Sequence, residues 1–206
     1  MLIVKFEGIE AVKRTLEKLP QELREIAVRP AINKVAEKAR AEINRAITEE
    51  FAVKASEVRN VVDIRKARGD KLEAVITISG SSGKLGRSLN MIHFLAAVQA
   101  AGHAFKVRGK KLTKADRAAL QQQLGFLIKK GGGIKKIEGA FLGNKGRTVF
   151  MREGKGRLPI KPVQVIGFSQ MFNSKRISNR VMQKINDDLP VEVDRAIKML
   201  INKGLL

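Results

Sequence analysis

Residues 31–50, AINKVAEKARAEINRAITEE, place apolar side chains at steps of three and four residues, with Lys, Glu and Arg between them. This spacing is that of an amphipathic α-helix, in which one face packs on the protein and the other faces water. Pro20 suits the first turn of such a helix, whereas Pro30 removes a backbone donor inside it. The pattern therefore predicts two consecutive helices or one kinked helix over residues 20–50. Its apolar face would consist of Ile32, Val35, Ala39, Ile43, Ala46 and Ile47.

A second long stripe predicts a C-terminal helix that begins at Asn173 or Ser174. Pro190 falls within this stripe, so we expect a kink or a break near residue 188, where Asp188 is able to cap the second half. A shorter pattern of the same kind predicts a helix over residues 9–19. The C-terminal stripe consists of Val181, Ile185, Leu189, Val193, Ile197, Leu200 and Ile201.

β-rich runs separated by Gly-containing turns fill the middle of the chain. Residues 61–67 and 72–80 flank the sequence RGDK, whose Gly and Asp favour a turn, and together they predict an antiparallel hairpin. Further strands are predicted at 103–109, 134–143, 147–153 and 157–167. Helical insertions are predicted at a short turn capped by Ser56, at 89–102 capped by Ser88, and at 112–133 capped by Thr113.

The order of these elements predicts an α+β fold, with an antiparallel sheet and long N-terminal and C-terminal helices packed against it. We expect a single domain over residues 1–206. It would be helical in 1–52, mainly β with helical insertions in 53–170, and helical again in 173–203.

The composition predicts a soluble protein of a reducing cytoplasm. The 206 residues include no Cys, which excludes disulfides and thiolate metal sites. No apolar run approaches the ~20 residues that span a bilayer. The N-terminal apolar run stops after four residues, unlike that of a signal peptide.

The net charge of +21 is concentrated in the middle of the chain, since residues 71–130 carry +9 and residues 131–170 carry +6. A local excess of this size attracts polyanions. Two interpretations remain open at this point. The charge could contact nucleic acid, or it could serve solubility and a basic surface that faces a protein partner.

No catalytic set is apparent, and we predict neither enzymatic activity nor a cofactor nor a metal. His93 and His103 lack a nearby acidic partner, and the four acids of residues 71–170 are scattered. Trp and Tyr are absent, so base stacking would depend on Phe. Seven Phe residues occupy predicted core positions, namely Phe94, Phe105, Phe126, Phe141, Phe150, Phe168 and Phe172.

The stretch GAFLGNKGRTVFMREGKGRLPIKPVQVIGFSQMF, residues 139–172, resembles the phage minor tail protein Z family. The similar elements are GAFL at 139–142, VFMREGKGRLPI at 149–160, and GFS at 167–169. One departure is Phe168, which stands where the family commonly has Pro. The resemblance implies a virion component that acts in tail completion without catalysis, as a tail-completion-like domain. It also implies that copies of the protein form a homo-oligomeric ring, with six as the favoured number of subunits. Its partners would be other phage tail proteins. Its location would be the virion tail, and the bacterial host cytoplasm during assembly.

The sequence also predicts a basic patch that contacts DNA without sequence preference, or an acidic partner surface. The runner-up function, based on charge alone, is a basic DNA- or RNA-binding accessory protein. The patch would consist of Lys145, Arg147, Arg152, Lys155 and Arg157.

Overall fold

The computed structural model describes residues 2–6, 21–69, 71–79, 88–95, 98–100, 103–105, 124–154 and 156–204. The predicted helix at 9–19, the first part of the predicted helix at 112–133, and Lys155 therefore lie outside the described residues. Within them, long helices and small antiparallel sheets form an α+β fold, as predicted. The predicted sheet is divided into several small ones.

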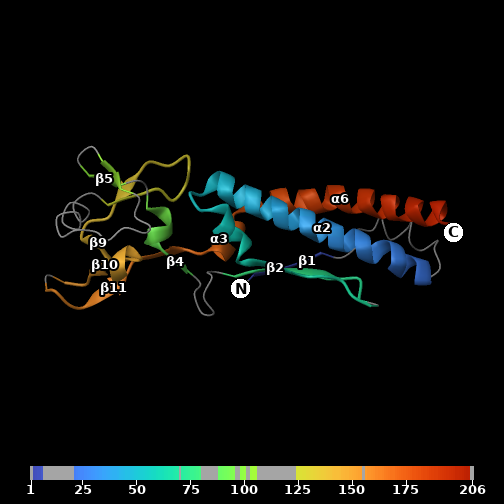
Figure 1. Ribbon diagram of the computed structural model, residues 1–206, viewed down its shortest axis with the longest axis horizontal. Coiled ribbons are helices and arrows are strands. Elements are labelled where there is room, and N and C mark those ends of the chain that lie inside the picture. The colour runs from blue at the N-terminus through green and yellow to red at the C-terminus, as the bar shows by residue number, and fades with distance from the viewer. Residues whose placement is uncertain are drawn as a thin grey trace.

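Two long helices lie side by side and run in opposite directions along the long axis of the molecule (Figure 1). Helix α2 spans Gln21–Glu50 without interruption, so of the two predicted arrangements the single helix is found, with Pro30 inside it. Helix α6 spans Lys175–Asn202 and follows Ser174, as predicted. The break near residue 188 is wrong, because α6 continues through Pro190. Asp188 does not cap a second half; its carboxylate contacts Lys38 and Lys184 instead.

The predicted hairpin is confirmed as β2, Val62–Arg65, and β3, Ala74–Ile78, which pair antiparallel. A strand that the sequence analysis missed, β1 at Leu2–Phe6, pairs with the other edge of β3. Gly69 lies in the connecting turn with a φ of +57°, a conformation that glycine adopts readily. The short helix α3, Ala55–Arg59, follows Lys54, so Ser56 lies inside it and is not its cap.

The predicted helix at 89–102 is wrong. Residues Ser88–Asn90 form strand β4, Met91–Phe94 form the 3₁₀ helix η1, and Val98–Ala100 form β5. Asn90 prevents a longer helix from beginning at Ser88, because its own backbone is extended and its Oδ1 accepts from Ile92 N. Strand β6, His103–Phe105, pairs with β5 and confirms the predicted strand there.

Of the predicted helix at 112–133, the structure describes residues 124–133, and these are also not helical. It contains β7, Gly125–Phe126, which pairs with β8, Lys135–Lys136. The strands predicted in 134–143, 147–153 and 157–167 are confirmed. They are β9 at Ala140–Gly143, β10 at Thr148–Arg152, β11 at Ile160–Pro162 and β12 at Gln164–Ile166.

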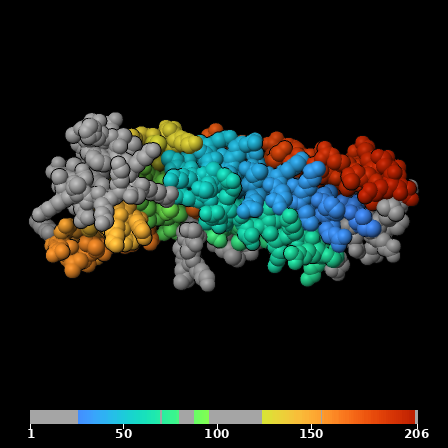
Figure 2. Space-filling model, viewed as in Figure 1, coloured from blue at the N-terminus to red at the C-terminus, as the bar shows by residue number. Residues whose placement is uncertain are grey.

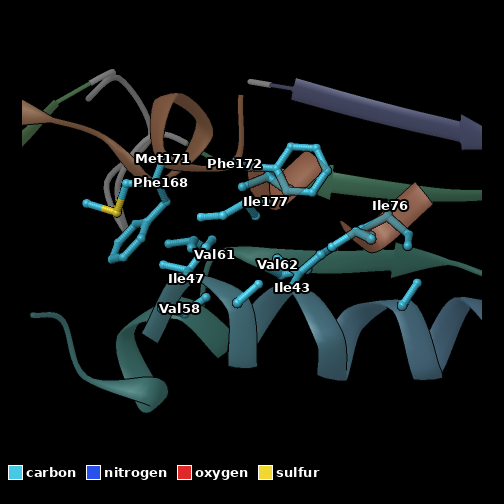
Figure 3. Close-up of a cluster of buried hydrophobic side chains, with 14 of the residues drawn as sticks. Ile43, Ile47, Val58, Val61, Val62, Ile76, Phe168, Met171, Phe172 and Ile177 are labelled. Atoms are coloured by element: carbon cyan, nitrogen blue, oxygen red, sulfur yellow. The ribbon is translucent and has the colours of Figure 1, made fainter. Parts of the chain in front are cut away.

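One continuous apolar core joins the helices to the sheets (Figure 3). Ile43 and Ile47 of α2 face Val62 and Ile76 of the β1–β3–β2 sheet. The short helix α5, Phe168–Phe172, closes this core, and Phe168 is buried there. Phe168 therefore fills the core. None of the helices in the described part of the chain has the length and apolarity that a membrane crossing requires.

Candidate binding surface

Strands β11, β10 and β9 form a three-stranded sheet, here called the arm sheet, at the end of the molecule away from the C-terminus (Figures 1 and 2). In the space-filling view the arm sheet forms the lower left surface of the molecule. The turn between β9 and β10 lies at one end of this sheet, and the turn between β10 and β11 lies at the other. The arm sheet therefore presents two separate turns to its surroundings.

The strand register places the residues of the predicted patch in two different turns. Lys145 and Arg147 lie in the β9–β10 turn, beside the pair Thr148–Gly143. Arg152 and Arg157 lie at the opposite end, beside the pair Arg152–Ile160. The two ends are about 13 Å apart, because each strand residue advances the chain by about 3.3 Å. The prediction of one contiguous patch is thus corrected to two basic turns.

The β9–β10 turn holds Lys145 in an unusual backbone conformation. Asn144 and Lys145 have φ angles of 48° and 56°, and Gly146 follows with 81°. A left-handed conformation costs a residue such as Lys roughly 1 kcal/mol, and Asn and Gly adopt it more readily. The turn thus carries an exposed cation on a strained backbone, which is a feature that occurs often at functional sites.

Two aromatic side chains lie on one face of the arm sheet. Phe141 and Phe150 are cross-strand partners, and their ring centroids lie 6.1 Å apart. The Arg152 guanidinium lies 5.4 Å from the centre of the Phe141 ring, a cation–π geometry. Gly143 allows the Phe150 ring to lie over β9, since a Cβ at position 143 would approach that ring to 2.6 Å. The prediction that Phe141 and Phe150 are core residues is therefore wrong, because both are only half-buried.

Asn90 attaches the arm sheet to the molecule through the backbone of β10. The Asn90 side chain accepts a hydrogen bond from Val149 N at 2.9 Å and donates one to Val149 O at 3.1 Å. Val149 is fully buried, and its backbone O also accepts from Val163 N. These contacts fix the arm sheet relative to the core and so determine where its basic turns project.

The basic side chains of the turns have few acidic partners. Lys161 pairs with Glu153 at 3.4 Å. Lys145, Arg147 and Arg157 are exposed and form no ion pair within the described ranges. The charge of the two turns is therefore available for an external anion.

Elsewhere, the described residues contain no group of His, Asp and Glu that could hold a metal ion. His93 Nδ1 lies 3.2 Å from Glu57 Oε2, so the prediction that His93 has no acidic group nearby is wrong. His103 lies in β6, and its side chain is not among those described.

A pocket that the sequence analysis missed lies where Glu49, Glu50 and Arg180 approach Gly131 and Arg176. No local pattern could have identified it, because these residues come from three distant segments.

Exposed basic turns beside partly exposed aromatic rings are features of a protein surface that binds other macromolecules. The family model of prophage minor tail protein Z matches residues 6–203, so the chain belongs to this family. The resemblance noted in residues 139–172 is thereby confirmed. No curated protein and no solved structure matches the chain.

Proposed function

We propose that this minor tail protein is a non-catalytic structural component of the virion that acts in tail completion. The observation that supports the proposal is the match of the prophage minor tail protein Z model to 6–203, nearly the whole chain. Its partners would be other tail proteins, and its location the tail, after assembly in the host cytoplasm. The test is deletion of the gene, which should lower the titre of infectious particles until the wild-type gene is supplied in trans.

We infer that several copies form a ring at the end of the tail, with six subunits as the number that the family resemblance favours. The elongated shape supports this proposal, because it places the α2–α6 pair and the arm sheet at opposite ends of each subunit (Figure 1). Cross-linking in purified tails should trap homo-oligomers. Recovery of monomer and of contacts with other proteins alone would contradict the ring.

We further propose that the basic turns contact a polyanion. It would be DNA passing through the tail or an acidic surface of a neighbouring tail protein. The availability of Lys145, Arg147 and Arg157 supports this, as does the +6 of residues 131–170. The comparisons give no support to an accessory DNA- or RNA-binding protein outside the virion. A single domain over 1–206 is also proposed, and it is supported by the continuity of the core from Val28 to Val193.

A further inference from the structure

A pocket of about 390 Å³ lies between the C-terminal end of α2, the N-terminal end of α6 and the loop that follows β7. Its size is within the range of ligand pockets, roughly 300–1,000 Å³. Ala46 and Ile177 supply apolar lining, and charged side chains line the remainder. The pocket is distinct from the arm sheet, none of whose residues line it.

The charges of the pocket leave one cation without a partner. Arg180 pairs with both Glu49 and Glu42, and Glu50 Oε1 lies 3.0 Å from Lys129 Nζ. Two of the three cations that line the pocket, Arg180 and Lys129, therefore have carboxylate partners. The third, Arg176, is exposed and makes no ion pair within the part of the chain that the structure describes. An anionic group at this position would pair with Arg176.

The second unsatisfied group is an acceptor. Glu50 Oε2 is buried and has no hydrogen-bond partner among the described residues, and only 16% of this side chain is exposed. Leaving a buried acceptor without a donor costs about 1–3 kcal/mol, so such atoms are nearly always bonded. A ligand that carries an N–H or O–H donor would satisfy this acceptor, and an anionic group on the same ligand would pair with Arg176.

Gly131 keeps this space clear. It lines the pocket, its φ is not in the left-handed region, and a Cβ built on it would have no heavy atom within 4 Å. The fold of this chain therefore does not require glycine at position 131. Close approach of another chain is a common reason for a glycine at such a position. Gly133, two residues on, has the same freedom but does not line the pocket.

We propose that this pocket binds an acidic peptide segment of a neighbouring tail protein. An Asp or Glu side chain of the segment pairs with Arg176, and a backbone N–H of the segment donates to Glu50 Oε2. A peptide fits better than a phosphate, because a phosphate group brings up to two negative charges close to Glu49 and Glu50 and few donors. The nature of the partner as a tail protein rests on the proposed function, whereas the binding chemistry does not.

The test is an NMR titration of the ¹⁵N-labelled full chain with the blocked peptide acetyl-Gly-Asp-Gly-amide, which brings one negative charge together with backbone N–H donors. We expect saturable shifts of the amides of Gly131, Gly132 and Arg176. The neutral peptide acetyl-Gly-Asn-Gly-amide should bind about tenfold or more weakly, because it lacks the charge that pairs with Arg176. Equal binding of the neutral peptide, tighter binding of inorganic phosphate, or shifts that do not saturate would overturn the proposal.

Two glycine variants provide a matched pair. Gly131→Gln places a side chain in the pocket and should abolish peptide binding, whereas Gly133→Gln should leave it unchanged. Circular dichroism and thermal unfolding should show the same fold for both, since neither glycine is constrained by its neighbours. If Gly131→Gln binds the acidic peptide as wild type does, the proposal is wrong.

Complementation of a gene deletion separates this inference from the proposed function. We expect Gly133→Gln to restore the titre and Gly131→Gln to fail. A deletion that does not lower the titre would contradict the proposed function, while the peptide titration would still decide on the pocket. Conversely, a protein that fails to bind the peptide overturns the inference even if the deletion strain lacks infectious particles.

Discussion

The side chain of Asn33 on α2 forms a pair of hydrogen bonds with the backbone of Ala67, 34 residues away. Asn33 Nδ2 donates to Ala67 O at 3.2 Å, and Ala67 N donates to Asn33 Oδ1 at 2.8 Å. The amide thus takes the place of a neighbouring strand and ties the end of the β2–β3 hairpin to the long helix. Asn90 makes the same pair of bonds with Val149 and holds the arm sheet in the same way.

We expect Asn33→Ala to lower the free energy of unfolding by about 1–3 kcal/mol, because it leaves two part-buried backbone groups without partners. Urea unfolding followed by circular dichroism measures the loss. Asn202→Ala is the control, since Asn202 is exposed at the end of α6 and should change stability by less than about 0.5 kcal/mol. Equal effects of the two substitutions would mean that the Asn33 amide does not stabilise the hairpin.

A buried carboxylate joins α2 to α6. Only 2% of the Glu192 side chain is exposed, and its oxygens lie 2.8 Å from Lys38 Nζ and 2.9 Å from Lys34 Nζ. Arg195 donates to the same carboxylate from within α6. The hydrogen bond from Lys38 contributes most to lowering the pKa of Glu192 from 4.5 to about 2, while burial acts in the opposite direction. The folded state therefore binds a proton at Glu192 less readily than the unfolded chain does.

The lowered pKa predicts acid sensitivity. The stabilisation from Glu192 is fully present above its unfolded pKa of 4.5, and it is lost as the pH falls towards the folded pKa of about 2. We expect this part of the loss to be on the order of 2 kcal/mol. The measurement is urea unfolding of wild type and Glu192→Gln at several values between pH 7 and pH 2. If both proteins lose stability with the same slope, Glu192 does not have the lowered pKa.

Packing of α2 on the sheet should govern overall stability. Ile43 is fully buried between α2 and the β1–β3–β2 sheet, so we expect Ile43→Ala to cost about 2–5 kcal/mol. Ile134 is 62% exposed, and Ile134→Ala should cost less than about 1 kcal/mol. Thermal unfolding of the two variants compares these sites. Similar melting temperatures would contradict the position of the core.

Any binding of DNA by the basic turns should depend on counterion release alone. We expect affinity to fall with salt, with a slope of about −0.9 per phosphate neutralised, and equally for all sequences. Arg147→Ala with Lys155→Ala should reduce that slope by up to about 2 and change stability little. An unchanged slope would exclude these two residues as phosphate contacts. If wild type does not bind DNA even at low salt, an acidic tail protein becomes the expected partner of the turns.

The long helices could be predicted because their signal is local. The stripes around Ile43 and Val181 repeat along the chain and mark the faces that are buried, although Ile201 at the end of the second stripe is exposed. The prediction of a helix at 89–102 failed because its signal is not local. The Asn90 side chain hydrogen-bonds to the backbone of Val149, which lies 59 residues away in the sequence. The predicted break near residue 188 also failed, since Asp188 is held by Lys38 of the other helix and packing continues past it. Contacts between distant segments outweighed local preference in both cases.

The candidate sites also divide into features that local sequence reveals and features that depend on contacts between distant segments. Lys145, Arg147, Arg152 and Arg157 could be identified from charge, but their separation into two turns depends on the register of β10. The pocket could not be found from the sequence, because the pair Arg180–Glu49 joins residues 131 positions apart. Family membership could be recognised, since the motif of residues 139–172 is contiguous.

The most direct test of the proposed role is electron microscopy of particles made with the gene deleted, beside particles made with the gene restored. Proteins that complete a tail are needed for its final form, so we expect the deletion to give tails of defective structure or tails not joined to heads. The restored gene should return both the normal tail and the titre. Normal tails and normal titre in the deletion strain would contradict a role in tail completion.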